Sequence, residues 1–112
     1  MPNNVITTAV FARKVKSLFK KYKTLGESLL SLQKALIENP RIGINYGSNI
    51  YKVRLADASK GKGTSGGFKV VTYLVTESQN EITIQLITIL NKSEEASITK
   101  DDVLKLIKKC GL

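Results

Sequence analysis

The sequence predicts one α+β domain, in which an N-terminal helical hairpin packs on a mainly antiparallel sheet of three to four strands. A C-terminal helix completes the expected order β-α-α-β-β-β-α. Three observations support this prediction. The chain has 112 residues, of which 42% are hydrophobic, enough to bury the core of a single domain over residues 1–112. Apolar residues recur at helical spacing near both ends, and runs typical of strands fill the middle.

The N-terminal part predicts a strand followed by a basic helix. Residues 4–8 are rich in β-branched side chains and indicate a short first strand. Four residues then recur at helical spacing: Phe11, Val15, Leu18 and Tyr22. Basic residues, including Lys14, Lys20 and Lys21, occupy much of the remaining surface, so this helix is amphipathic and strongly basic.

A second helix is expected directly after the first. Thr24 and Glu27 have the spacing of a capping box, and apolar residues continue at helical spacing to residue 37. Asn39-Pro40 ends the helix, because the residue before a proline avoids helical backbone geometry. The short joint between the helices predicts a hairpin.

Three strand-like runs follow, over residues 50–56, 68–76 and 82–90. The link between the last two is short and polar, which predicts a β-hairpin. The link between the first two is glycine-rich and carries Lys60 and Lys62. In the C-terminal helix, Thr99 and Asp102 indicate a capping box, and Ile98 and Val103 have the spacing of a hydrophobic staple.

Charge is the strongest property of the whole sequence. It contains 18 Lys and Arg against 9 Asp and Glu, a net charge of +9, with the excess lying before residue 70. Such a charge favours an anionic partner, which is nucleic acid, an acidic protein or a membrane surface. No apolar run approaches the ~20 residues that span a bilayer, and no signal peptide is recognisable, so we expect a cytoplasmic protein without membrane attachment.

The residue inventory excludes several chemistries. The chain has no histidine and one cysteine, Cys110, so we expect no metal site of usual composition, no cofactor and no histidine-dependent triad. A single thiol forms no internal disulfide, which fits a reducing compartment. The glycine-rich link lacks the spacing of a phosphate-binding loop and leads into a strand, so nucleotide hydrolysis is rejected.

The remaining candidate site is a cluster of cations on the sheet. Strand alternation places Lys52 and Arg54 on one face of their strand, and Lys69 and Tyr73 on one face of the next. If these faces align, the four side chains gather, with Lys60, Lys62 and Lys92 within reach of them. Such a cluster can hold a phosphodiester and stabilise the charge of its transition state. RNA supplies its own 2′-hydroxyl nucleophile, so the protein needs only a base, an acid and cations, and a lysine beside other positive charges can serve as the base.

These residues also carry a family resemblance that extends over nearly the whole chain. It rests on Asn39-Pro40, Ile50-Tyr51-Lys52-Val53-Arg54-Leu55-Ala56, Gly66-Gly67-Phe68-Lys69 and Leu90-Asn91-Lys92-Ser93, in this order. The pattern resembles the RelE/ParE superfamily of toxins from type II toxin–antitoxin systems, and most closely the RelE/HigB-like branch. Leu90 and Asn91 stand where members often have a tyrosine or histidine.

The resemblance implies a toxin that enters the ribosome, cleaves mRNA without a metal and is inhibited by a cognate antitoxin protein. It implies catalytic roles for Lys52, Arg54, Lys69 and Lys92, and we assign RNA binding to Lys14, Lys20, Lys21, Lys60, Lys62 and Tyr73. Two alternatives stay open: a ParE-like inhibitor of DNA gyrase, and a non-catalytic basic nucleic-acid-binding module.

Overall fold

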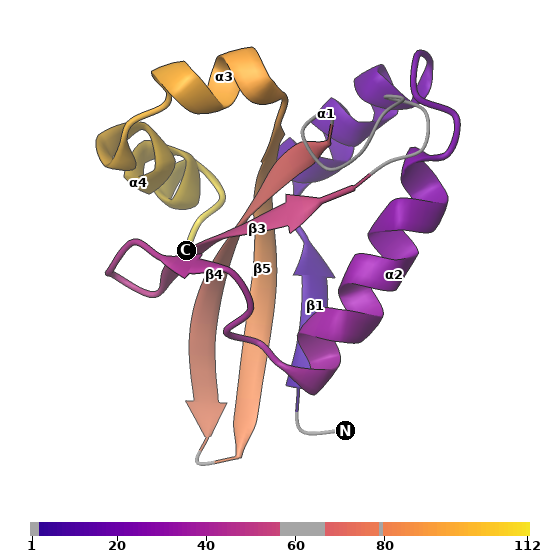
Figure 1. Ribbon diagram of the computed structural model, residues 1–112. Coiled ribbons are helices and arrows are strands. Elements are labelled where there is room, and N and C mark those ends of the chain that lie inside the picture. The colour runs from indigo at the N-terminus through magenta and orange to yellow at the C-terminus, as the bar shows by residue number, and fades with distance from the viewer. Residues whose placement is uncertain (1–2, 57–66, 79) are drawn as a thin grey trace.

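A computed structural model describes residues 3–56, 67–78 and 80–112 (Figure 1). Five strands form one mixed sheet in the order β1-β5-β4-β3-β2. The elements are β1 (Asn3–Thr7), α1 (Ala9–Phe19), α2 (Leu25–Glu38), β2 (Ile44–Asn45), β3 (Ile50–Leu55), β4 (Phe68–Ser78), β5 (Glu81–Leu90), α3 (Lys92–Ser97) and α4 (Lys100–Lys109). β1 pairs with β5 in parallel, and the other three pairings are antiparallel.

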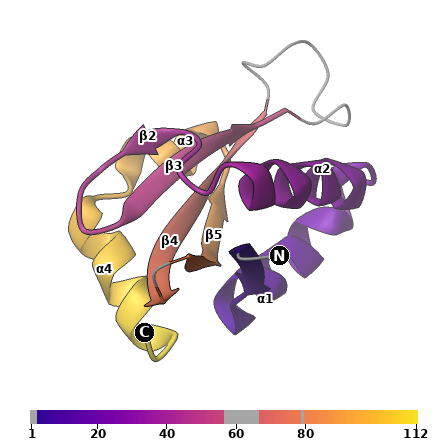
Figure 2. The ribbon, with the colours of Figure 1, turned by 90° about the horizontal axis from the view of Figure 1, so that it is seen from below.

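Helices cover both faces of the sheet (Figure 2). The hairpin of α1 and α2 packs on one face, where Phe11 and Leu36 join alternate residues of β3, such as Val53. The other face carries a smaller cluster, in which Val71 and Ile107 connect the sheet to α4. Because both faces are covered, β5 is buried continuously from Thr83 to Leu90, including the polar residues Thr83, Gln85 and Thr88.

The joint between β1 and α1 fixes the helical hairpin to the sheet. The Thr8 hydroxyl donates to the Leu86 carbonyl oxygen at 2.7 Å and accepts from the Phe11 backbone N–H at 3.2 Å. Thr8 is the N-cap of α1 and is buried. One side chain therefore both begins α1 and holds it against β5.

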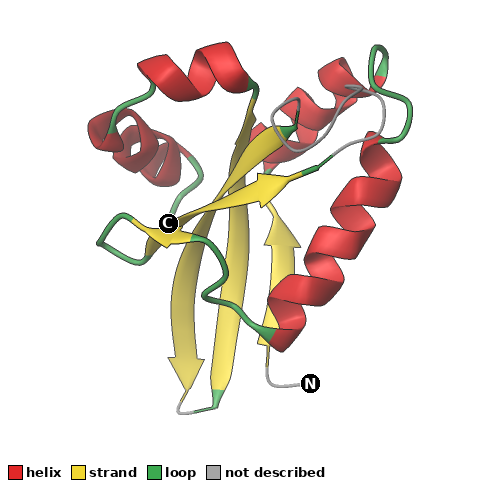
Figure 3. Ribbon diagram, viewed as in Figure 1, coloured by secondary structure: helices red, strands yellow, loops and turns green. Residues whose placement is uncertain are grey.

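The predicted α+β class, the helical hairpin, the β4–β5 hairpin and the mainly antiparallel sheet are confirmed (Figure 3). The sheet has five strands where three to four were expected, because β2 is only two residues long and too short to leave a periodic pattern. The prediction also lacked α3. Asn91 and Glu94 form a capping box there, which is the signal for a helix start that could have revealed it.

Two capping predictions had different outcomes. The Thr99–Asp102 capping box is present at the start of α4. The Thr24–Glu27 box is wrong: Thr24 is the N-cap of α2, but its side chain makes no capping hydrogen bond. Its backbone, with φ −88° and ψ 0°, departs from the extended conformation that usually aims an N-cap side chain at the helix. Among the described residues, no helix is both long and apolar enough to cross a bilayer.

Candidate functional site

The register of β3 and β4 brings three cationic side chains onto one face of the sheet. Arg54 lies opposite Lys69, and Lys52 lies opposite Val71. Val71 packs with α4, so this is the face that α3 and α4 partly cover. We call Lys52, Arg54 and Lys69 the cationic face. The sequence predicted that these side chains would gather only if the two strands paired with their cationic faces aligned. The observed register of β3 and β4 gives this alignment.

Lys69 is the most enclosed member of the cationic face. Its Nζ lies 2.8 Å from Glu95 Oε1 of α3, and the two side chains are 17% and 31% exposed. Arg54, directly across the strand pair, is exposed. Like charges placed directly opposite each other repel. The Glu95 carboxylate therefore offsets part of the repulsion and holds the Lys69 ammonium in place.

Lys52 is positioned by an aromatic ring. Its Nζ lies 4.6 Å from the centroid of the Tyr46 ring, a cation–π distance, and Tyr46 is 39% exposed. Tyr46 directly follows β2, which pairs with β3 through Ile44 opposite Lys52. Gly43 permits this approach: its φ is +101°, and a Cβ there would lie 2.2 Å from the Lys52 carbonyl oxygen.

Tyr73 shares the face but has a different environment. It lies opposite Ile50 and packs, half-buried, against the cluster formed with α4. This contact makes Tyr73 a support for the face as well as a candidate RNA contact. Lys60 and Lys62 lie outside the described residues.

Lys92 begins α3, two residues beyond Leu90, which is the partner of Lys69 on β5. Lys92 is exposed and lies one helical turn before Glu95, so both project from the same side of α3. Leu90 is buried in the core and Asn91 is the N-cap of α3. The family resemblance leads one to expect a tyrosine or histidine at these two positions. In this chain, Leu90 and Asn91 have structural roles there instead.

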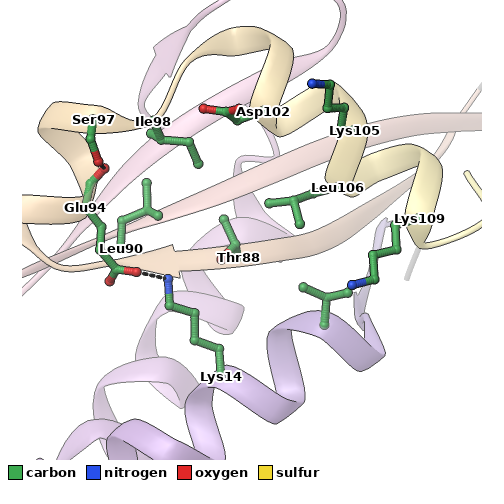
Figure 4. Close-up of a pocket in the computed structure, with 11 residues that line it drawn as sticks. Lys14, Thr88, Leu90, Glu94, Ser97, Ile98, Asp102, Lys105, Leu106 and Lys109 are labelled. Atoms are coloured by element: carbon green, nitrogen blue, oxygen red, sulfur yellow. Dashed lines mark hydrogen bonds and ion pairs between the residues drawn. The ribbon is translucent and has the colours of Figure 1, made fainter.

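The lysines of α1 do not join the cationic face. Lys14 Nζ lies 2.6 Å from Glu94 Oε2, which links α1 to α3 across one end of the sheet (Figure 4). This ion pair borders a groove of about 580 Å³ that is also lined by Lys105 and Lys109 of α4. Lys20 and Lys21 follow α1 and are exposed. α1 packs on the opposite face of the sheet from Lys52, so the basic residues form at least two separate surfaces.

A titratable group at the groove is held in its charged form. The backbone N–H and the hydroxyl of Thr99, with help from Lys105, lower the pKa of Asp102 below its usual value. This carboxylate caps α4. Over residues 3–56, 67–78 and 80–112, no group of three or more His, Cys, Asp or Glu side chains is arranged to hold a metal ion.

Glu95 and Tyr46 are site residues that the sequence prediction missed, and it also missed the structural role of Glu94 beside Glu95. The capping box from Asn91 to Glu94 signals a helix, and such a helix would have brought both carboxylates close to the end of the sheet. Tyr46 gave no periodic signal, because it lies in the irregular segment between α2 and β3.

No protein-family model and no curated protein sequence matches the chain. Among solved structures, the chain is similar to a mutant of the E. coli toxin RelE in the free state. The TM-score is 0.59 at 19% sequence identity, and the alignment covers 97% of this chain and 98% of that one. The two proteins therefore share one fold over nearly their whole lengths.

Proposed function

We propose that this chain, whose fold is that of the toxin RelE, is itself the toxin of a type II toxin–antitoxin system and cleaves mRNA on the ribosome. The observation that carries the proposal is the placement of Lys52, Arg54 and Lys69 together on one face of the shared fold. Three cations on rigid strands can grip a phosphodiester and stabilise the extra negative charge of its transition state.

Each cation has a distinct task in this proposal. The Arg54 guanidinium is exposed and its planar fork suits two oxygens of one phosphate. Lys69 and Lys52 act as positioned point charges, each oriented by a neighbour, Glu95 for the first and Tyr46 for the second. Lys92 extends the surface along the RNA backbone. Lys60 and Lys62, which lie outside the described residues, are also assigned to RNA binding.

Lys14, Lys20 and Lys21 have a second task, because α1 lies on the other face of the sheet. A protein that works inside a ribosome meets ribosomal RNA on several sides, and these lysines suit such phosphate contacts. The same function places the protein in the cytoplasm, where ribosomes and mRNA are found.

A cognate antitoxin is the expected protein partner. A groove of about 450 Å³ between α1 and α2 is lined by the exposed apolar side chains of Phe19 and Leu30 and by Lys16. An amphipathic segment with acidic residues would bury this apolar surface and neutralise the basic charge of α1, and it would become ordered on binding.

Expression of the chain without its antitoxin tests the function. Growth arrest and new 5′ ends in ribosome-bound mRNA, mapped by primer extension, are the expected results. The purified protein should cut mRNA in programmed ribosomes more efficiently than free mRNA. Intact mRNA together with blocked supercoiling by purified gyrase would instead establish the gyrase inhibitor. Salt-sensitive RNA binding with neither effect would establish the non-catalytic module.

A further inference from the structure

Cleavage of RNA at the cationic face requires an atom that accepts the proton of the 2′-hydroxyl. We propose that Glu95 is this general base, an inference that rests on the proposed function. Its carboxylate meets the Lys69 ammonium at 2.8 Å and is therefore at the cationic face itself. The side chain is 31% exposed, which leaves it accessible to a substrate.

The other members of the cationic face are poorly suited to accept a proton. A lysine ammonium and an arginine guanidinium are donors without an acceptor lone pair, so the lysine base that the sequence allowed would first have to lose its proton. Lys69 donates to Glu95, and Lys52 lies over the Tyr46 ring. In the contact between Lys69 and Glu95, the carboxylate is the only proton acceptor.

Glu94, the adjacent carboxylate, is committed to structural contacts. Its Oε1 accepts from the Asn91 backbone N–H at 3.2 Å, and its Oε2 accepts from Lys14 at 2.6 Å. The two glutamates therefore have different neighbours. Glu94 contacts the N-cap of α3 and Lys14 of α1, whereas Glu95 contacts Lys69 of β4. The chain therefore offers a matched control for the substitution of Glu95.

The reaction balances without a further reactant. Glu95 takes the proton of the 2′-hydroxyl, the 2′-oxygen forms a bond to phosphorus, and the bond from phosphorus to the 5′-oxygen breaks. Lys52, whose Cα lies about 7 Å along β3 from that of Arg54 by strand geometry, gives a proton from its ammonium to the departing 5′-oxygen. Arg54 and Lys69 hold the non-bridging oxygens. The products are a 2′,3′-cyclic phosphate and a 5′-hydroxyl, and solvent returns Lys52 and Glu95 to their starting protonation states.

The test compares E95Q with E94Q in single-turnover cleavage of mRNA on programmed ribosomes. Loss of a general base lowers the rate by roughly 10²–10⁴-fold, so we expect E95Q to be slower by that factor. The cleavage rate of E94Q should stay within about threefold of the wild-type rate, because glutamine also completes a capping box. Binding to an RNA with 2′-deoxyribose at the cleavage site should be unchanged or tighter in E95Q, since a negative charge is removed from the face.

The shape of the pH–rate profile separates catalysis from positioning. Loss of a general base changes how the rate depends on pH, so the profiles of the wild type and E95Q should differ in shape and not only in height. If E95Q does not fold, as judged by circular dichroism, E95D is measured instead, and its rate should fall while the wild-type shape persists. Cleavage by E95Q at the wild-type rate or faster, or a slow E95Q whose profile keeps the wild-type shape, overturns the role of Glu95. A wild-type protein that cuts no mRNA overturns the proposed function as well.

Discussion

Arg54 and Lys69 lie directly opposite each other across β3 and β4, and Lys69 forms an ion pair with the Glu95 carboxylate of α3. Two like charges at opposed positions of a sheet repel, so this arrangement is unfavourable for folding by itself. A site that binds an anion gains from the same arrangement, because the anion relieves the repulsion. Residues that act on substrate often have such a cost to stability.

The first prediction concerns Arg54. Replacement of Arg54 by alanine removes the exposed cation that can hold two phosphate oxygens, and we expect the cleavage rate on ribosomes to fall by roughly 10²–10³-fold. Lys34→Ala is the matched control, since Lys34 is an exposed cation on α2, on the other side of the sheet. Equal loss in both variants would show that net charge, and not the cationic face, sets the rate.

The second prediction concerns the path of RNA over the surface. For single-stranded RNA the logarithm of affinity falls with the logarithm of salt concentration by about 0.7 per neutralised phosphate. Lys52→Ala should therefore reduce this slope by about 0.7 for a short oligonucleotide. Lys34→Ala should leave the slope unchanged, because Lys34 is an exposed cation of α2, on the opposite face. Fluorescence anisotropy at several salt concentrations measures both, and an equal change for Lys34→Ala would place the oligonucleotide on α2 as well.

The third prediction uses two glycines with opposite environments. Gly43→Ala forces a left-handed backbone and a Cβ against the Lys52 carbonyl, so it should lower the free energy of unfolding by at least about 1 kcal/mol. Gly26 is in α2 and a Cβ there meets only Phe19 at 3.4 Å, an ordinary contact. Gly26→Ala should therefore raise the free energy of unfolding, by roughly 0.5–1 kcal/mol. Urea denaturation measures both, and a harmless Gly43→Ala would contradict the packing of β2 on β3.

The fourth prediction concerns acid stability. The pKa of Asp102 is lowered from 3.8 by its hydrogen bonds with Thr99, so the folded state favours the carboxylate. The resulting stabilisation is present above the ordinary pKa and is lost as the pH falls through the lower, folded-state pKa. The melting temperature of the wild type should therefore be higher than that of D102N at neutral pH. The difference between the two melting temperatures should shrink below about pH 4.

Thermal melting from pH 7 to pH 2 checks this expectation. D101N is the control, because it removes one negative charge from the same turn of α4 and leaves the contact between Asp102 and Thr99 intact. A constant difference between D102N and the wild type over the whole range would contradict the capping role.

Most of the helices and strands, and the alternation of side chains on each strand, could be predicted from the sequence, because they follow from local backbone geometry. The period of a strand places Lys52 and Arg54 on one face regardless of what surrounds them. The period of a helix gives the apolar stripe of α1, and the spacing of Thr99 and Asp102 gives the start of α4.

Which side chains meet could not be predicted from the sequence, because it depends on how the elements pack in three dimensions. Lys69 and Glu95 are 26 residues apart, and Lys14 and Glu94 are 80 apart, so no local pattern contains either contact. Both depend on where α3 lies over the end of the sheet, which is set by the packing of the core beneath it. For the same reason the sequence predicted a cluster of cations from single strands, while the fold placed a carboxylate among them and moved the lysines of α1 to a separate surface.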